Sequence, residues 1–230
     1  MVVLGTKLYV SGEARQRALD GLRTMVDNRI GDLTVDYEVG VRHDGFPSVT
    51  VEGPDRVVAR NALREEWGAI APDGPSPGEP AVGTLERWDD DGFVLDAGGT
   101  VRVPTDRIGL GPGTPAQVRE RFGLVQHVPM WFVVDEATEA NEGGHAALAD
   151  REHDRLYGWT RGNGRVNVNS ATRSEVRATV NRAGHADDVV GVDRLGLLEQ
   201  SIVCAENTDP PGLIASIGNY LPAELLAVVP

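Results

Sequence analysis

Residues 82–104 read VGTLERWDDDGFVLDAGGTVRVP, and this stretch decides how the middle of the chain is expected to fold. Short apolar runs alternate in it with runs of turn residues, Asp-Asp-Asp-Gly and Gly-Gly. The pattern around it predicts strands over 81–87, 92–97, 100–104 and 128–134, and a helix over 115–123. Short strands separated by turns favour a small β-barrel.

Two linker-like stretches flank this barrel. APDGPSPGEP at 71–80 contains four prolines and two glycines, and DEATEANEGG at 135–144 is acidic and ends in paired glycines. Such stretches are typical of domain boundaries. They divide the chain into three predicted domains, which cover residues 1–70, 79–135 and 145–230.

The outer two domains show mixed helix and strand patterns. Residues 1–70 read as strand, helix, strand, strand, helix, which is typical of a ferredoxin-like or KH-like α+β sandwich. After a charged helix over 145–157, the rest of the third domain reads β-α-β-β-α-β, the ferredoxin-like order. In it, Thr172 and Glu175 form a capping box for the first helix. The predicted class is therefore α+β with several domains: ferredoxin-like or KH-like, OB-like barrel, and ferredoxin-like.

The composition is acidic and nearly free of lysine. The chain carries 22 lysines and arginines against 35 aspartates and glutamates, a formal net charge of -13, and Lys7 is the only lysine. This composition suits a cytoplasm at molar salt, where the Debye length is about 3 Å and repulsion between surface carboxylates is weak. We therefore expect a halophilic source, and we infer little about partners from the net charge. Residues 1–70, with nine basic and eleven acidic residues, are the least acidic part.

Several classes of protein are disfavoured. No apolar run is long enough to span a bilayer, and the N-terminus lacks the features of a signal peptide, so we expect a cytoplasmic protein with no membrane partner. Cys204 is the only cysteine and forms neither an internal disulfide nor a cysteine metal cluster. No nucleophile, base and orienting group converge by spacing, so we lean against an enzyme and expect no cofactor and no metal site.

The barrel stretch resembles the first strands of OB-fold barrels of the ribosomal RNA-binding type. The resemblance implies that Phe93, which follows a turn glycine, lies on the nucleic-acid face and stacks on a base, with Trp88 as a second stacking surface. The second aromatic usual in that family is missing, because Val101 and Val103 stand near its place. The alternative is a structural barrel with Phe93 in its core.

Arginines recur at helical spacing. Arg56, Arg60 and Arg64 fall on one helix face, as do Arg173 and Arg177 in the third domain. Arginines aligned in this way clamp phosphates, although a solvated face paired to nearby carboxylates explains the same spacing. The glycine-rich stretch GWTRGNGRVNVN at 158–169 adds two further candidate phosphate-binding residues, Arg161 and Arg165. The alternative for this stretch is a flexible loop.

The C-terminal segment offers a different function. Its strand, TDPPGLI turn and helix are similar to the start of ACT domains, which bind amino acids at such a turn. This resemblance implies a small-ligand site at the helix start, between Asp209 and Gly212. The alternative is an ordinary helix start.

Over the full chain, RAGHADDVVGVDRLGLLEQSIVCAENTDPPGLIASIG (182–218), VTVEGPDRVVARNALREEWG (49–68) and the barrel stretch resemble a haloarchaeal protein family, domain of unknown function 2110. The resemblance implies a lineage and no particular activity. The function we expect is non-catalytic binding of RNA or another single-stranded nucleic acid. The alternatives are an amino-acid sensor that uses the C-terminal domain and a protein-interaction scaffold.

Overall fold

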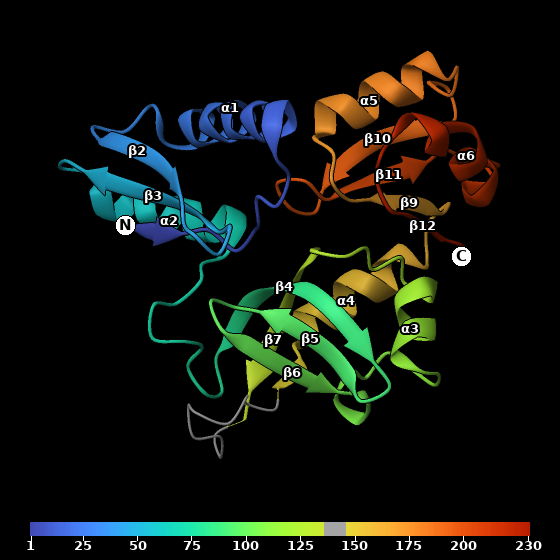
Figure 1. Ribbon diagram of the computed structural model, residues 1–230, viewed down its shortest axis with the longest axis horizontal. Coiled ribbons are helices and arrows are strands. Elements are labelled where there is room, and N and C mark those ends of the chain that lie inside the picture. Colours follow the sequence, from blue (N-terminus) through green and yellow to red (C-terminus); the bar gives the residue numbers. More distant parts are fainter. Residues whose placement is uncertain (136–145) are drawn as a thin grey trace.

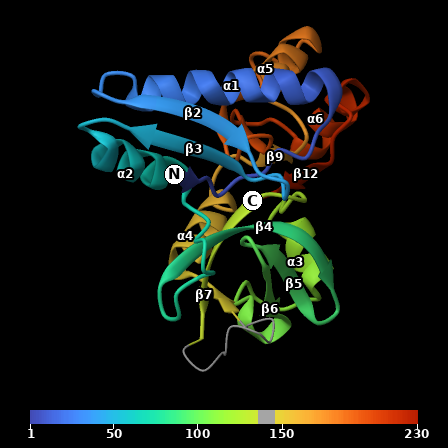
Figure 2. The same ribbon diagram turned by 60° about the vertical axis from the view of Figure 1, so that its left-hand side comes forward.

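In the computed structural model, which describes residues 1–135 and 146–230, three antiparallel sheets each form the centre of one domain. The predicted α+β, multi-domain class is confirmed. The N-terminal and C-terminal domains lie side by side, and the central domain lies below both, so that all three meet at one place (Figures 1 and 2). None of the helices in the described ranges is long and apolar enough to cross a bilayer.

The N-terminal domain has the predicted order of elements. They are β1 (Val2–Val3), α1 (Gly12–Ile30), β2 (Asp36–Val41), β3 (Pro47–Glu52) and α2 (Arg56–Trp67). The sheet order is β1-β3-β2, and a bridge between Leu4 and Ala69 adds the beginning of a fourth strand beside β1. This is the ferredoxin-like arrangement with a vestigial last strand.

Regular apolar spacing explains why both helices cover one face of this sheet. In α1, buried side chains recur every four residues from Ala18 to Ile30. In α2, Ala59, Leu63 and Trp67 repeat the same spacing. The alternating residues Val49 and Val51 of β3 pack against both helices.

The central domain contains a strongly curled five-stranded sheet of order β6-β5-β4-β7-β8. Its elements are β4 (Pro80–Asp89), β5 (Gly92–Asp96), β6 (Thr100–Pro104), a 3-10 turn (Thr105–Arg107), α3 (Pro115–Arg121), β7 (Pro129–Val134), β8 (Ala146–Leu148) and α4 (Asp150–Trp159). The edge strands β6 and β8 approach each other but are not paired in the described residues. The sheet of the predicted OB-like barrel is therefore not closed, and the OB likeness stays a resemblance.

The boundary between the second and third domains differs from the prediction. Strand β8 pairs with β7, and α4 packs on the same sheet, so residues 146–159 belong to the central domain and not to the third. The sequence pattern misled us because β8 is only three residues long. The predicted linker at 135–144 falls, apart from Asp135, outside the described residues.

The C-terminal domain matches its predicted pattern. Its elements are β9 (Arg165–Val168), α5 (Arg173–Arg182), β10 (Val189–Arg194), β11 (Gln200–Cys204), α6 (Pro210–Ile217), a 3-10 turn (Gly218–Tyr220) and β12 (Leu225–Val228). The sheet order β10-β11-β9-β12 is that of a ferredoxin-like fold. Thr172 and Glu175 form the predicted capping box at the start of α5.

Candidate functional site

The turn between β10 and β11 joins all three domains. Leu197 and Leu198 of this turn pack into the hydrophobic core of the N-terminal domain. The backbone N–H of Leu197 donates to the hydroxyl of Thr6 over 2.7 Å. Next to these leucines, Glu199 is fully buried and Arg194 faces a cleft between the domains. One short segment thus supplies both the support and part of the lining of the candidate site.

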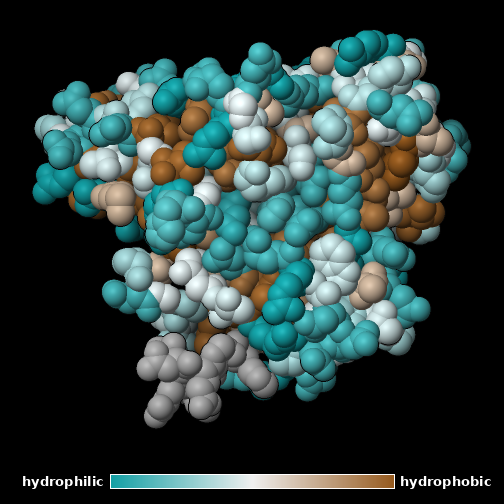
Figure 3. Space-filling view, in the orientation of Figure 1, coloured by the Kyte–Doolittle hydropathy of each residue, from teal (hydrophilic) through white to brown (hydrophobic). Residues whose placement is uncertain are grey.

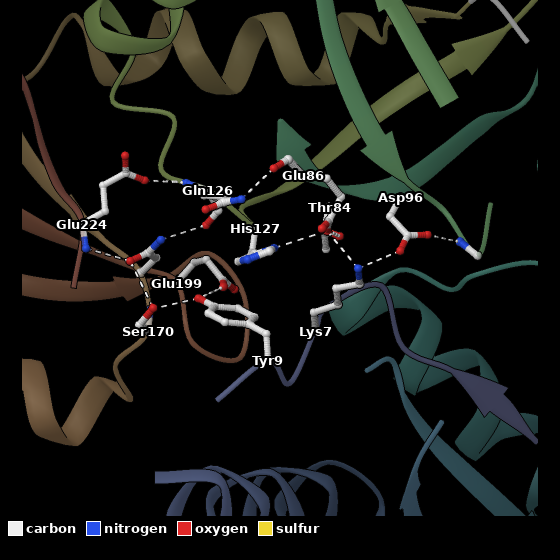
Figure 4. A network of polar contacts seen from close by, with 12 residues as sticks. Lys7, Tyr9, Thr84, Glu86, Asp96, Gln126, His127, Ser170, Glu199 and Glu224 are labelled. Atoms are coloured by element: carbon white, nitrogen blue, oxygen red, sulfur yellow. Dashed lines mark hydrogen bonds and ion pairs between the residues drawn. The ribbon is translucent and has the colours of Figure 1, made fainter. Parts of the chain in front are cut away.

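A network of polar contacts links the three domains (Figure 4). The only lysine of the chain, Lys7, is 8% exposed and comes from the segment between β1 and α1. Its ammonium group lies 2.9 Å from a carboxylate oxygen of Glu86 and 2.6 Å from one of Asp96, both in the central domain. A compact ammonium with three donors can serve both carboxylates, so Lys7 ties the N-terminal domain to the central one.

The network continues to the C-terminal domain through Tyr9. Its hydroxyl donates to Glu199 over 2.7 Å and accepts from the backbone N–H of Ser170 over 2.9 Å. The ring of Tyr9 lies 3.9 Å from that of His127, whose Nδ1 is 3.2 Å from Glu86 (Figure 4). His127 and Ser170 both have positive φ angles, 68° and 56°. Such backbone costs on the order of 1–3 kcal/mol per residue and persists where the surroundings fix it.

The two glutamates of this network have opposite pKa shifts. Burial raises the pKa of Glu86, but hydrogen bonds from His127 and Lys7 outweigh it and bring the pKa down to about 2. Burial raises the pKa of Glu199 to about 8, although Tyr9 donates to its carboxylate. The other carboxylate oxygen, Oε2, has no hydrogen-bond partner. Glu86 is therefore a charged ion-pair partner, whereas Glu199 is largely a neutral acid at pH 7.

A cleft of about 200 Å³ opens where the three domains meet. Hydrophilic residues gather along the line between the lower domain and the upper two (Figure 3). The cleft is lined by Gly5, Thr6, Glu65, Glu66, Trp67, Gly68, Val82, Pro129, Trp131, Arg151, Arg155, Arg194, Leu195 and Gly196. We call it the arginine–tryptophan cleft. With about 30 Å³ per water molecule, its volume suits a single phosphate group or base.

Three arginines give the cleft its chemistry. The guanidinium of Arg151 lies 3.7 Å from the ring centroid of Trp131 and forms no ion pair with a carboxylate in the described part of the chain. Arg155 donates to the carbonyl oxygen of Pro129 over 2.9 Å and pairs with the buried Glu152. Guanidinium groups bind phosphate through paired N–H donors and stack on flat rings.

The third arginine, Arg194, lies over Trp67 at 5.5 Å from its ring centroid. A carboxylate oxygen of Glu66 is 3.8 Å away, too far for a hydrogen bond, so this pairing is weak. Burial lowers the pKa of Arg194, as does the charge of Arg173, whereas Glu66 raises it.

Two buried donors in the cleft lack partners. Trp67 is 8% exposed and its indole Nε1 has no hydrogen-bond acceptor; the Nε of Arg155 is also unpaired. Both atoms are buried, as are the unpaired Nε atoms of Arg60 and Arg119 outside the cleft, so they do not by themselves indicate a ligand. Glycine allows two walls of the cleft to approach each other closely. At Gly68, which has a φ of 67°, a Cβ would lie only 2.7 Å from the side chain of Val82.

The predicted stacking residues lie elsewhere. The ring of Phe93 is fully buried in the core of the central domain, so its expected role in base stacking is wrong and the structural alternative applies. Trp88 is half-buried, and the guanidinium of Arg119 lies 3.8 Å from its ring centroid, which covers one face. Neither residue lines the cleft.

The predicted arginines are distributed over several surfaces. Arg56 and Arg64 of α2 are exposed and contact Gly53 and Asn61, whereas Arg60 is half-buried against the carbonyl of Val51. None of the three forms an ion pair in the described residues, because Glu65 and Glu66 face Arg29 and Arg194 instead.

In the C-terminal half, Arg161 is exposed just after α4, and Arg165 pairs with Asp193 over 2.9 Å. Arg173 and Arg177 are exposed on α5 and line a second hollow between α5 and β10.

The structure disfavours an anion site at the start of α6. The carboxylate of Asp209 accepts from the N–H of Gly212 over 3.0 Å, and Pro210 and Pro211 have no N–H to offer. The helix start is therefore occupied by its own cap. In the described residues, no group of three or more histidine, cysteine or acidic side chains is placed to hold a metal ion.

Comparison with known protein families shows to which family the chain belongs. Family models match residues 1–73 as the DUF2110 N-terminal domain, 75–160 as the central domain and 163–229 as the C-terminal domain. The chain belongs to the DUF2110 family. These matches put residues 146–159 in the central domain, as the sheet pairing does. No curated protein matches the chain.

Sequence reasoning does not find the cleft, because its residues come from six separate segments of this DUF2110 protein. One local signal was available. Arg151 and Arg155 stand four residues apart, a spacing that places both on one face of α4.

Proposed function

We propose that this DUF2110 protein binds RNA or another single-stranded nucleic acid without catalysing a reaction, and that the arginine–tryptophan cleft is its site. One observation carries the proposal: three arginines and two tryptophans from all three domains converge on one cleft. Phosphate and base are the two chemical groups that arginine and aromatic side chains bind together.

Each group has a defined role in this proposal. Arg194 and Arg155 hold a phosphate, since both residues line the cleft, from the C-terminal and the central domain. The outer face of Arg151, whose inner face stacks on Trp131, receives a base. Stacking of this kind tolerates any base, so we expect little sequence preference.

The acidic composition does not exclude this partner. Glu65 and Glu66 lie at the same cleft and offset part of its positive charge. We also propose that the protein comes from a halophilic archaeon and is cytoplasmic. Its binding should therefore be measured from low salt up to molar KCl. At molar salt, short-range bidentate contacts are retained better than long-range repulsion.

The test measures the affinity for a fluorescent single-stranded RNA by anisotropy. We expect Arg151→Gln and Arg194→Gln each to weaken binding about tenfold. Only Arg194→Gln, which removes a phosphate contact, should reduce the slope of log K against log salt, by about 0.7. Arg23→Gln on α1 is the matched control, because Arg23 is exposed and, among the residues that the structure describes, pairs only with Asp20 three residues earlier. The proposal fails if wild type binds no RNA at any salt concentration, or if the three variants lose affinity equally.

A further inference from the structure

Arg194 connects the cleft to a second arginine-lined hollow. Arg194 is the last residue of β10, and Arg173 is the first residue of α5. In a β9-α5-β10 unit the helix runs antiparallel to the strands, so the start of α5 lies near the end of β10. The electrostatic effect of Arg173 on Arg194 agrees with this placement.

The second hollow has about 280 Å³ and lies between α5 and β10. Arg173 and Arg177 border it, one helical turn apart, and the exposed Val190 borders its other side. Arginines at this spacing are about 5–6 Å apart at Cβ, which is similar to the spacing of successive phosphates in an extended strand. We call it the α5–β10 groove.

The carboxylates around the groove are largely committed elsewhere. Glu175, between the two arginines, caps α5 and pairs with Arg17 over 2.9 Å. Asp188 accepts from His185, and Asp193 pairs with Arg165. Within the described residues, neither Arg173 nor Arg177 forms an ion pair. Their charge is therefore available to an anionic partner.

We propose that the α5–β10 groove extends the nucleic-acid site, so that a single strand leaving the arginine–tryptophan cleft passes Arg194 and continues along Arg173 and Arg177. This inference rests on the proposed function. It adds a footprint and a path: a phosphate or base is held in the cleft, and two further phosphates are held on α5. The groove is a backbone contact in this proposal, since its two arginines bind phosphates.

Oligonucleotide length provides the test. RNA of three nucleotides fills only the cleft, whereas RNA of ten nucleotides also reaches the groove. We expect Arg173→Gln combined with Arg177→Gln to weaken binding of the longer RNA by at least tenfold and to reduce its salt slope by about 1.4. The same double variant should leave the affinity for the shorter RNA unchanged.

The matched control combines Arg182→Gln, on the same helix but outside the groove lining, with Arg23→Gln on α1. It removes two charges, so it corrects for the change in net charge. Three outcomes overturn the inference: an equal loss in the control, an equal loss for both RNA lengths, or no loss for the longer RNA. If Arg194→Gln still weakens the short RNA, the proposed function stands without the groove. If wild type binds neither RNA, both proposals fall.

Discussion

Replacing Glu199 by glutamine should change how the stability of this protein depends on pH. Glu199 is fully buried at the junction of the three domains, and one of its carboxylate oxygens accepts from Tyr9 while the other has no partner. Its pKa is raised from 4.5 to about 8, by burial first and by the negative charge of Glu86 as well. The folded protein therefore holds a proton that the unfolded chain releases at a lower pH.

The direction and size of the effect follow from this difference. Between pH 4.5 and about 8, the unfolded state binds fewer protons than the folded state at Glu199, so the free energy of unfolding falls as the pH rises. The slope approaches about 1.4 kcal/mol per pH unit, and over this window the loss is on the order of 5 kcal/mol. Glutamine cannot ionise, so Glu199→Gln should remove this fall.

Guanidinium chloride denaturation at a series of pH values from 5 to 9 would measure it. At pH 5 the variant should be equal to wild type or less stable by about 1–3 kcal/mol, because its amide N–H₂ replaces a neutral acid at a place without an acceptor. At pH 9 it should be the more stable protein. Glu13→Gln, at a side chain that is 96% exposed, is the control and should follow wild type. Parallel stability curves for wild type and Glu199→Gln across this range would refute the reasoning.

Two further predictions concern the junction and the central core. Lys7→Met leaves Glu86 and Asp96 without their shared cation and should lower the free energy of unfolding by about 2–4 kcal/mol. Lys7→Arg keeps the charge and should cost less. Denaturation at pH 7 compares the two variants, and an equal loss would mean that the size of the side chain matters and its charge does not. Phe93→Ala leaves a cavity at a fully buried site and should lower the free energy of unfolding by about 3–5 kcal/mol. The RNA affinity of the fraction that remains folded should stay unchanged. A weaker RNA affinity with undiminished stability would restore the stacking role that the burial of Phe93 contradicts.

The sequence predicted those parts of the fold that depend on local signals. Apolar residues at every fourth position placed the buried face of α1 correctly, and the capping box of Thr172 and Glu175 located the start of α5. Strand β8 gave no comparable signal, because three residues are too few to show an alternating pattern. Because the prediction lacked β8, it placed the domain boundary before this strand. It thereby assigned α4, with Arg151 and Arg155, to a different domain from the sheet on which it packs.

The sequence could not show which way Phe93 points. A strand in an open sheet has two faces, but in the curled sheet of the central domain Phe93, Val94 and Leu95 are all buried, so alternation along β5 carries no information about exposure. The cleft was hidden for a different reason. Thr6 and Arg194 are far apart in the chain and meet only because the turn after β10 inserts into the N-terminal core.

The net charge of -13 and the arginine-lined cleft act over different distances, so they need not oppose each other. Repulsion between the whole chain and a polyanion is the sum of many separations longer than the Debye length of about 3 Å at 1 M salt, and it largely disappears there. Contacts of guanidinium groups with phosphate are made at hydrogen-bond distance and keep their geometry at any salt concentration. Added salt weakens these contacts through counterion release, but it also removes the repulsion. A strongly acidic protein can therefore bind a single strand through a few converging arginines, provided that its carboxylates are paired elsewhere, as Glu175 and Asp193 are beside the α5–β10 groove.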